Sequence, residues 1–168
     1  MAIAYASQPG NPYSVPKRQV TAEVILPGRH PLTVKLFLNE YAEGHDGREK
    51  PSDVLNGPMT FLPVTDHQGG VVFLRRDSVL AVSVAAVEEH QADVPRLEEL
   101  DPVGVKSHQV EVMLEEGTTI RGVVTYLMPE SQRRLQDFLN TTERFLALRE
   151  DDTMHLVNKR RIVQVRPV

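Results

Sequence analysis

Short runs of alternating apolar and polar residues dominate this chain, and they predict β-strands. Val20, Ala22 and Val24 alternate with polar residues, and Val110 and Val112 do the same in the second half. Further strands are expected at 32–38, 60–64, 71–75 and 79–84, and again at 119–127, 144–148, 154–158 and 162–166. Five short antiparallel strands can close into a small barrel. The pattern therefore predicts an all-β fold with short helical inserts, organised as two tandem five-stranded barrels.

The two halves also align with each other as an internal repeat. Residues 51–64 lie over 135–148 without a gap, and 22–26 and 73–82 match 110–114 and 156–165. The identical pairs are Asp53/Asp137, Leu55/Leu139, Asn56/Asn140, Phe61/Phe145 and Leu62/Leu146. Because the matches keep their order and the gaps fall in expected loops, we interpret the chain as a duplication. Phe61 and Phe145 are accordingly expected in equivalent buried places.

Composition shifts suggest four segments. Residues 1–17 contain three prolines and predict an extended arm, and 18–84 form the first barrel repeat. Residues 85–103 carry six acidic side chains against one arginine and are expected to link the halves, partly as short helices. The second barrel repeat covers 104–168. A polar insert at 39–50, present only in the first half, is expected to be a solvated loop, with a contact to a partner as the alternative.

A short helix is predicted between the second and third strands of each half. Leu135, Phe138 and Leu139 share one helix face, and Pro51 begins a shorter copy in the first half. We expect each helix to cover one end of its barrel, with Leu55 and Leu139 buried beneath it.

The repeated polar residues of these helices are expected to be structural. Asp53 and Asp137 can accept backbone hydrogen bonds at the turn after the helix, and Asn56 and Asn140 suit the helix end. Neither carboxylate has a second titratable partner at fixed spacing, as an acid–base pair would need.

Composition narrows the possible functions further. The formal net charge is −4, with 19 basic and 23 acidic residues, which argues against coating nucleic acid or membranes by bulk charge. The absence of cysteine excludes disulfides and thiol chemistry. No apolar run approaches the length of a membrane span, and no export signal is visible, so a cytoplasmic location is expected. The spacing of the six histidines matches no metal site, and no cofactor or nucleophile motif occurs, so neither a cofactor nor enzymatic activity is expected.

The second half carries a specific pattern of glycines and strands. Gly117 lies in a turn between two strands, Gly122 is central in the second of them, and a basic turn separates the last two strands. This pattern resembles the Sm-like (LSm) family, in particular the bacterial Sm-like RNA chaperones, whose fold is a small SH3-like barrel. The sequence departs from that family in placing its helix between strands two and three and in having Val34 where the first half would need the central glycine.

The basic turn is the concentrated positive site of the chain. Lys159, Arg160 and Arg161, with Arg166 nearby, are candidates to contact an anion or a partner surface. The leading hypothesis is a non-catalytic tandem-barrel scaffold that assembles with itself or with a protein partner, as the resemblance implies for its strand edges. The alternative is binding of RNA or a nucleotide by the basic turn. Nucleic-acid affinity would then rest on phosphate contacts and fall with salt.

Overall fold

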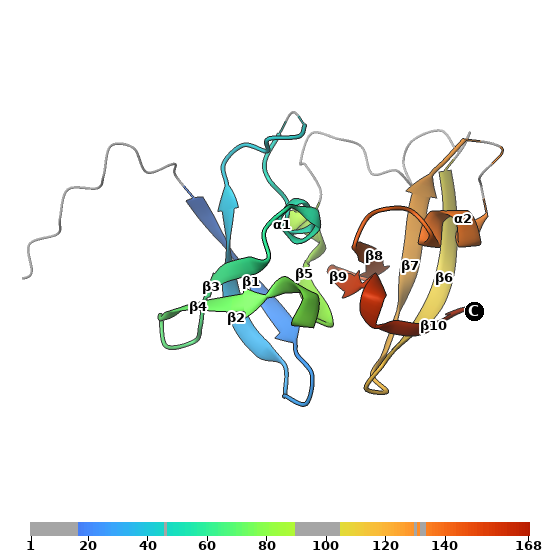
Figure 1. Cartoon of the computed structure of the whole chain (residues 1–168). Helices are drawn as coiled ribbons and strands as arrows, with labels where there is room; N and C mark the ends of the chain where they lie inside the picture. The colour runs from blue at the N-terminus through green and yellow to red at the C-terminus, as the bar shows by residue number, and fades with distance from the viewer. Residues whose placement is uncertain (1–16, 46, 90–104, 130, 132–133) are drawn as a thin grey trace, which may run out of the picture.

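Ten strands in the described part of the chain form one antiparallel sheet. The computed structural model describes residues 17–45, 47–89, 105–129, 131 and 134–168. The strand order in the sheet is β10-β6-β7-β8-β9-β5-β1-β2-β3-β4. Each half therefore has the same spatial order, with its fifth strand first and its fourth strand last. Figure 1 shows the two halves side by side, with β5 and β9 where they meet.

The succession of elements is also the same in both halves. The first half contains β1 (Lys17–Ile25), β2 (Leu32–Asn39), α1 (Pro51–Asn56), β3 (Phe61–Thr65), β4 (Val71–Arg75), the 3-10 turn η1 (Arg76–Ser78), β5 (Ala81–Ala85) and the 3-10 turn η2 (Ala86–Glu88). The second half contains β6 (Val105–Leu114), β7 (Thr119–Leu127), α2 (Leu135–Leu139), β8 (Phe145–Glu150), β9 (Thr153–Asn158), the 3-10 turn η5 (Lys159–Arg161) and β10 (Ile162–Pro167).

The all-β class is confirmed, but the structure does not show two separate closed barrels. β9 of the second half pairs with β5 of the first half, so the ten strands make one continuous sheet. β4 and β10 end this sheet, and neither has a second partner strand among the described residues. The sheet stays open because the fourth strand of one half pairs with the fifth strand of the other half.

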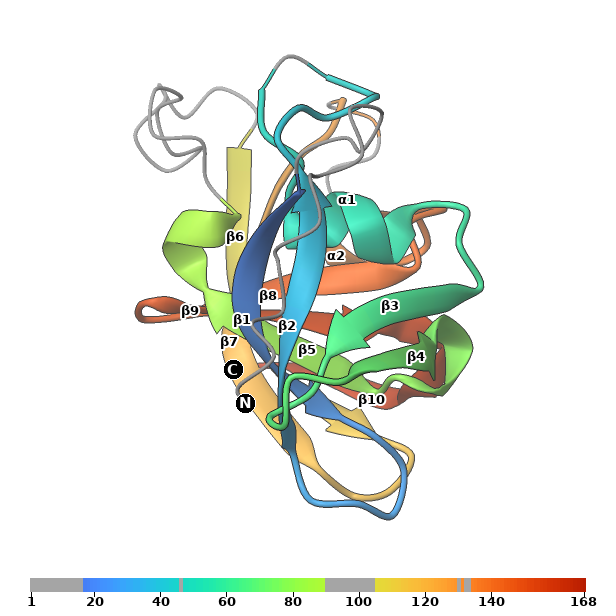
Figure 2. The ribbon, with the colours of Figure 1, turned by 90° about the vertical axis from the view of Figure 1, so that its left-hand side faces the viewer.

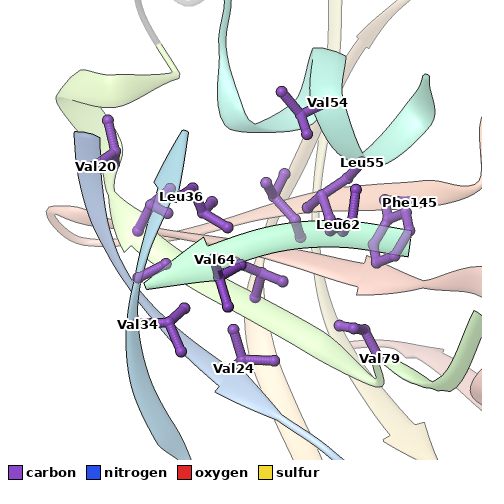
Figure 3. Packing of buried hydrophobic residues seen from close by; sticks show 14 of the residues in the cluster. Val20, Val24, Val34, Leu36, Val54, Leu55, Leu62, Val64, Val79 and Phe145 are labelled. Atoms are coloured by element: carbon purple, nitrogen blue, oxygen red, sulfur yellow. The ribbon is translucent and has the colours of Figure 1, made fainter. Parts of the chain in front are cut away.

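Two hydrophobic clusters fill the molecule, and each crosses the boundary between the halves. The first cluster is built on the first half but includes Phe145, Met154 and Leu156 from the second. The second cluster includes Leu80 and Ala81 from the first half. Figure 3 shows the Phe145 ring at one end of the first cluster, beside Leu55 and Leu62. The two halves consequently share their cores and cannot be regarded as independent packing units.

The repeated phenylalanines do not occupy equivalent environments. Phe145 is 2% exposed, as expected, whereas Phe61 is 55% exposed. The helices differ in the same way, since Leu55 of α1 is fully buried and Leu139 of α2 is only half-buried. The reason is position in the sheet, because β8 lies in its interior whereas β3 lies beside the open strand β4.

The repeated aspartates cap the start of each helix and not the turn after it. Asp53 Oδ2 accepts a hydrogen bond from the backbone N–H of Lys50 at 2.8 Å. Asp137 Oδ2 accepts one from the backbone N–H of Arg134 at 3.3 Å. Both carboxylates satisfy donors that a helix start leaves without intrahelical partners. Both contacts lie at the start of the helix and not at the turn after it. Asp53 Oδ2 also lies 2.8 Å from His45 Nε2, a titratable partner that the spacing in the sequence did not predict.

Gly122 is required by a close approach between strands. A Cβ atom at this position would lie 2.9 Å from the backbone oxygen of Arg149 and 3.1 Å from Cβ of Leu148. The missing side chain thus allows β7 to cross β8 closely, as a glycine within a strand often does. Gly117 has a φ of +91°, which the turn between β6 and β7 needs.

Two of the expected segments, the N-terminal arm and the linker, lie mostly outside the described residues. β1 begins at Lys17, and most of the expected arm, 1–16, lies outside them. Of the expected linker, 85–103, residues 90–103 also lie outside the described part of the chain, and 86–88 form a 3-10 turn where a short helix was expected. The insert after β2 is closed by Glu49, whose carboxylate accepts hydrogen bonds from the backbone and side chain of Asn39.

Glu89 should make the stability of the fold depend on pH. Its carboxylate is buried and accepts a hydrogen bond from the backbone N–H of Ser52 at 2.8 Å. Burial raises the pKa of Glu89 above its usual 4.5, and the carboxylate of Asp53 adds to this, whereas Ser52 and Lys50 oppose it. Between pH 4.5 and the raised pKa, the folded protein binds more protons than the unfolded chain, so the free energy of unfolding should fall as pH rises.

We expect Glu89→Gln to remove this component of the slope, because glutamine keeps the acceptor oxygen without the charge. Urea titrations of both proteins across this pH range would measure it. Parallel curves for the two proteins would contradict the assignment.

Candidate assembly junction and open edges

The pairing of β9 with β5 joins the two halves. The register runs from Ala81 opposite Val157 to Ala85 opposite Thr153. Beyond these pairs, the backbone N–H of Asn158 donates to Leu80 O at 2.9 Å. Within each half, the fifth strand pairs with the first strand in the same register. Val82 lies opposite Val24, and their repeat counterparts Val165 and Val112 also lie opposite each other. We call this contact between the halves the internal junction.

Apolar side chains from both halves fill the internal junction. Phe145 of β8 and Leu156 of β9 are buried in the first cluster, together with Leu55 of α1 and with Val79, the residue that follows η1. Deep burial of large apolar groups is a major source of stabilisation, at about 25 cal/mol per Å². The internal junction therefore has the character of a protein core.

Two asparagines fix the backbone at this contact. Asn56 Oδ1, at the end of α1, accepts hydrogen bonds from the backbone N–H groups of Arg144 at 2.9 Å and Phe145 at 2.8 Å. Asn158 is fully buried, and its Nδ2 donates to Val79 O at 2.9 Å. The repeated Asn56 thus acts across the junction and not only within its helix.

A charged cluster around Asp77 borders the junction. Asp77 Oδ1 accepts a hydrogen bond from Arg144 Nη1 at 2.6 Å, and Arg160 Nη1 lies 3.7 Å from Oδ2. The backbone oxygen of Asp77 accepts hydrogen bonds from Nε and Nη2 of Arg161 at 3.0 and 2.8 Å. Arginines of the second half thus surround an aspartate of the first half.

The basic turn that the sequence singled out is largely engaged within the chain. Lys159 Nζ donates to O and Oγ1 of Thr141, and desolvation lowers the pKa of Lys159, against an opposing effect of Glu143. Arg161 also binds Glu115 at 2.7 Å. Arg160 and Arg166 are exposed. Lys159 and Arg161 thus serve the fold, whereas Arg166 is exposed and Arg160 is exposed beside Asp77.

One polar arrangement at the junction was not found by sequence reasoning. Ser83 Oγ lies 2.7 Å from His155 Nδ1, and His155 Nε2 lies 3.1 Å from Glu150 Oε2. A hydroxyl, an imidazole and a carboxylate in such a chain are the groups of nucleophilic catalysis. None of these three residues lines the surface hollow between the β1–β2 and β6–β7 turns. The register of β5 on β9 brings Ser83 to His155 across about 70 positions of sequence, whereas the β8–β9 hairpin places Glu150 beside His155. No local motif could therefore reveal all three residues together.

The open strand β4 presents an apolar surface. Phe61, Val71 and Phe73 are all exposed, Phe73 to 68%. Phe61 lies opposite Arg75 and Pro63 lies opposite Phe73, so these side chains share one face of the sheet. Figure 2 shows β3 and β4 side by side. We call Phe61, Val71 and Phe73 the β4 patch.

Among the residues that the structure describes, no group of three or more histidine, aspartate or glutamate side chains could hold a metal ion. No helix in the same part of the chain is long and apolar enough to cross a membrane. No family model, no curated protein and no solved structure matches this chain.

Proposed function

We propose that this protein is a non-catalytic assembly module that binds other protein surfaces through the open edges of its sheet. One observation carries this proposal. The internal junction pairs β9, the fourth strand of the second half, with β5, the fifth strand of the first half. The remaining fourth strand, β4, and the remaining fifth strand, β10, form the two ends of the sheet. Unpaired strand edges are templates for pairing with another chain.

The β4 patch adds an apolar component to this edge. Contiguous apolar surface of this kind marks interaction sites on soluble proteins. The resemblance of the second half to Sm-like proteins supports the same proposal, because small barrels of that family join through strand edges. We interpret the equal succession of elements in the two halves as a duplication that made one such contact permanent within the chain.

The first test is the mass of the full chain in solution. After purification with nuclease treatment, light scattering over a range of concentrations should give a mass above that of one chain, and the absorbance ratio should show no nucleic acid. Assembly should survive high salt, because strand pairing and apolar contacts do not depend on screened charges. A chain that remains a single copy at all concentrations would contradict self-assembly.

A second candidate function is binding of RNA through the two exposed arginines, Arg160 and Arg166. The double variant Arg160→Ala/Arg166→Ala spares Lys159 and Arg161, which hold their own chain. If the arginines bind phosphates, each lost contact should reduce the slope of log affinity against log salt by about 0.7–0.9. Filter binding with a single-stranded RNA measures this. An unchanged slope would exclude these residues as phosphate contacts.

A further inference from the structure

We propose that the β4 patch of one copy of this chain docks on the α2–β10 end of a second copy, in the geometry of the internal junction. This inference rests on the proposed function and names its partner. The two surfaces are the unused counterparts of the two sides of the internal junction.

The β4 patch corresponds to the side of the internal junction that the second half provides. In the repeat alignment, Phe61 corresponds to Phe145, Phe73 to Leu156, and β4 to β9. Phe145 and Leu156 are 2% and 0% exposed, whereas Phe61 and Phe73 are 55% and 68% exposed. The same type of surface is thus buried inside the chain and bare at its end.

The α2–β10 end corresponds to the side that the first half provides. Equivalent residues are again less buried at the end of the chain, as Leu80 is 0% exposed and Val163 is 63% exposed. Four apolar residues at this end are only partly buried against the second cluster, although their counterparts are buried members of the first cluster: Phe138, Leu139, Ile162 and Val165. Those counterparts are Val54, Leu55, Val79 and Val82. We call Phe138, Leu139, Ile162, Val163 and Val165 the socket. The counterparts of four of them share the first cluster with Phe145, and Leu80, the counterpart of Val163, packs in the second cluster.

Asn140 provides the polar contact that the socket needs. Oδ1 of its counterpart Asn56 accepts hydrogen bonds from the backbone N–H groups of Arg144 and Phe145 across the internal junction. Asn140 is exposed, its Nδ2 donates to Gln136 O at 2.8 Å, and no described residue donates to its Oδ1. In the docked pair, Oδ1 of Asn140 accepts the backbone N–H groups of Thr60 and Phe61 of the second copy.

The backbone edges of β10 and β4 are compatible with this docking. In an antiparallel pair, successive residues point their backbone N–H and C=O groups alternately toward and away from the neighbouring strand. Val168 N donates to Gln109 O, so the backbone groups of Val165, three residues earlier, point away from β6. Arg76 N donates to Thr60 O, which likewise turns those of Phe73 away from β3. The register of the internal junction then places Val165 opposite Phe73 of the second copy. Pro167 lacks an N–H on the same edge, which limits the pairing to the start of β10.

Charge is complementary at the same contact. Arg160 occupies in the second half the position that Asp77 occupies in the first half. These two residues already lie 3.7 Å apart across the internal junction, and docking adds a second contact of the same kind, between Arg160 of one copy and Asp77 of the other. Within the chain, the β1–β2 turn with Arg29 and His30 lies beside the β6–β7 turn with Glu116, and the two turns line one surface hollow. Docking brings the same acidic turn beside the basic turn of the next copy.

Two variants with opposite ends blocked test the docking. Phe61→Glu places a charge in the β4 patch and leaves the socket intact, and Val163→Glu does the reverse. Both side chains are exposed, so each variant should fold as the wild type does. Val87→Glu, on an exposed residue of η2 outside both surfaces, is the matched control. Circular dichroism and thermal scans of all four proteins check the fold.

The expected masses differ for each sample. Wild type and Val87→Glu should increase in mass with concentration, because head-to-tail contacts repeat until they close or extend further. Phe61→Glu and Val163→Glu should each remain single chains. Their equimolar mixture should give a dimer of one copy of each and nothing larger, since it contains one intact patch facing one intact socket.

Other results overturn the inference in distinguishable ways. If Val163→Glu alone still associates, the β4 edges pair with each other or use another surface, and only the inference fails. If the mixture remains monomeric while wild type assembles, the same conclusion follows. If wild type itself is a single chain at every concentration, self-assembly fails together with the inference.

Asn140→Ala tests the register. Loss of two backbone hydrogen bonds should weaken association roughly ten- to hundredfold. Asn56→Ala, the matched change at the internal junction, should lower the thermal midpoint instead. Association of Asn140→Ala with wild-type strength would overturn the proposed geometry.

Discussion

Phe145→Ala should lower the free energy of unfolding by about 3–5 kcal/mol, the usual effect of truncating a buried phenylalanine. The ring is 2% exposed and lies in the first cluster, so its removal leaves a cavity between the two halves. The same change at Phe61, its repeat counterpart, should cost within about 0.5 kcal/mol in the monomer, since that ring is largely exposed. Urea titration at a concentration where the chain is monomeric measures both.

This pair of variants tests the sheet order directly. Two separate barrels would bury both rings alike, and the two substitutions would then cost the same. Equal losses in the monomer would therefore contradict the internal junction. A loss only at Phe145 would support it, and a larger cost of Phe61→Ala at concentrations where the protein assembles would support docking of the β4 patch.

Leu55→Ala should destabilise the monomer by about 2–5 kcal/mol, because Leu55 is fully buried between α1 and the first cluster. Leu139→Ala should cost clearly less, since Leu139 is half-buried at the border of the second cluster. Thermal scans of the two variants, with Phe145→Ala as a reference for full burial, give the comparison.

The difference between the two leucines has a specific cause. α1 is covered by Phe145 from the other half, whereas α2 lies at the end of the sheet. If Leu139→Ala costs as much as Leu55→Ala in the monomer, α2 is packed as tightly as α1 and the socket is not open. That result would contradict both the burial and the inference built on it.

Local patterns in the sequence were enough to predict the strands and the two short helices α1 and α2. Alternating apolar positions gave the strands, because a strand with one buried face needs a period of two. The expected strands 32–38 and 60–64 correspond within one or two residues to β2 and β3. The glycine at 122 was expected within a bent strand, and the approach of Arg149 to it gives the reason. The repeat alignment also anticipated the equal succession of elements in the two halves.

The burial of each repeated residue was decided by tertiary structure alone. Phe61 and Phe145 occupy matching positions in aligned segments, and local sequence assigns them the same place. Their exposures differ because burial depends on what lies opposite, and only the pairing of β9 with β5 puts the first half against Phe145. The same pairing aligned Ser83 with His155 and gave Asn56 its backbone partners. Strand pairing joins residues about 70 to 90 positions apart, so it is set by the packing of the whole chain and no local pattern records it.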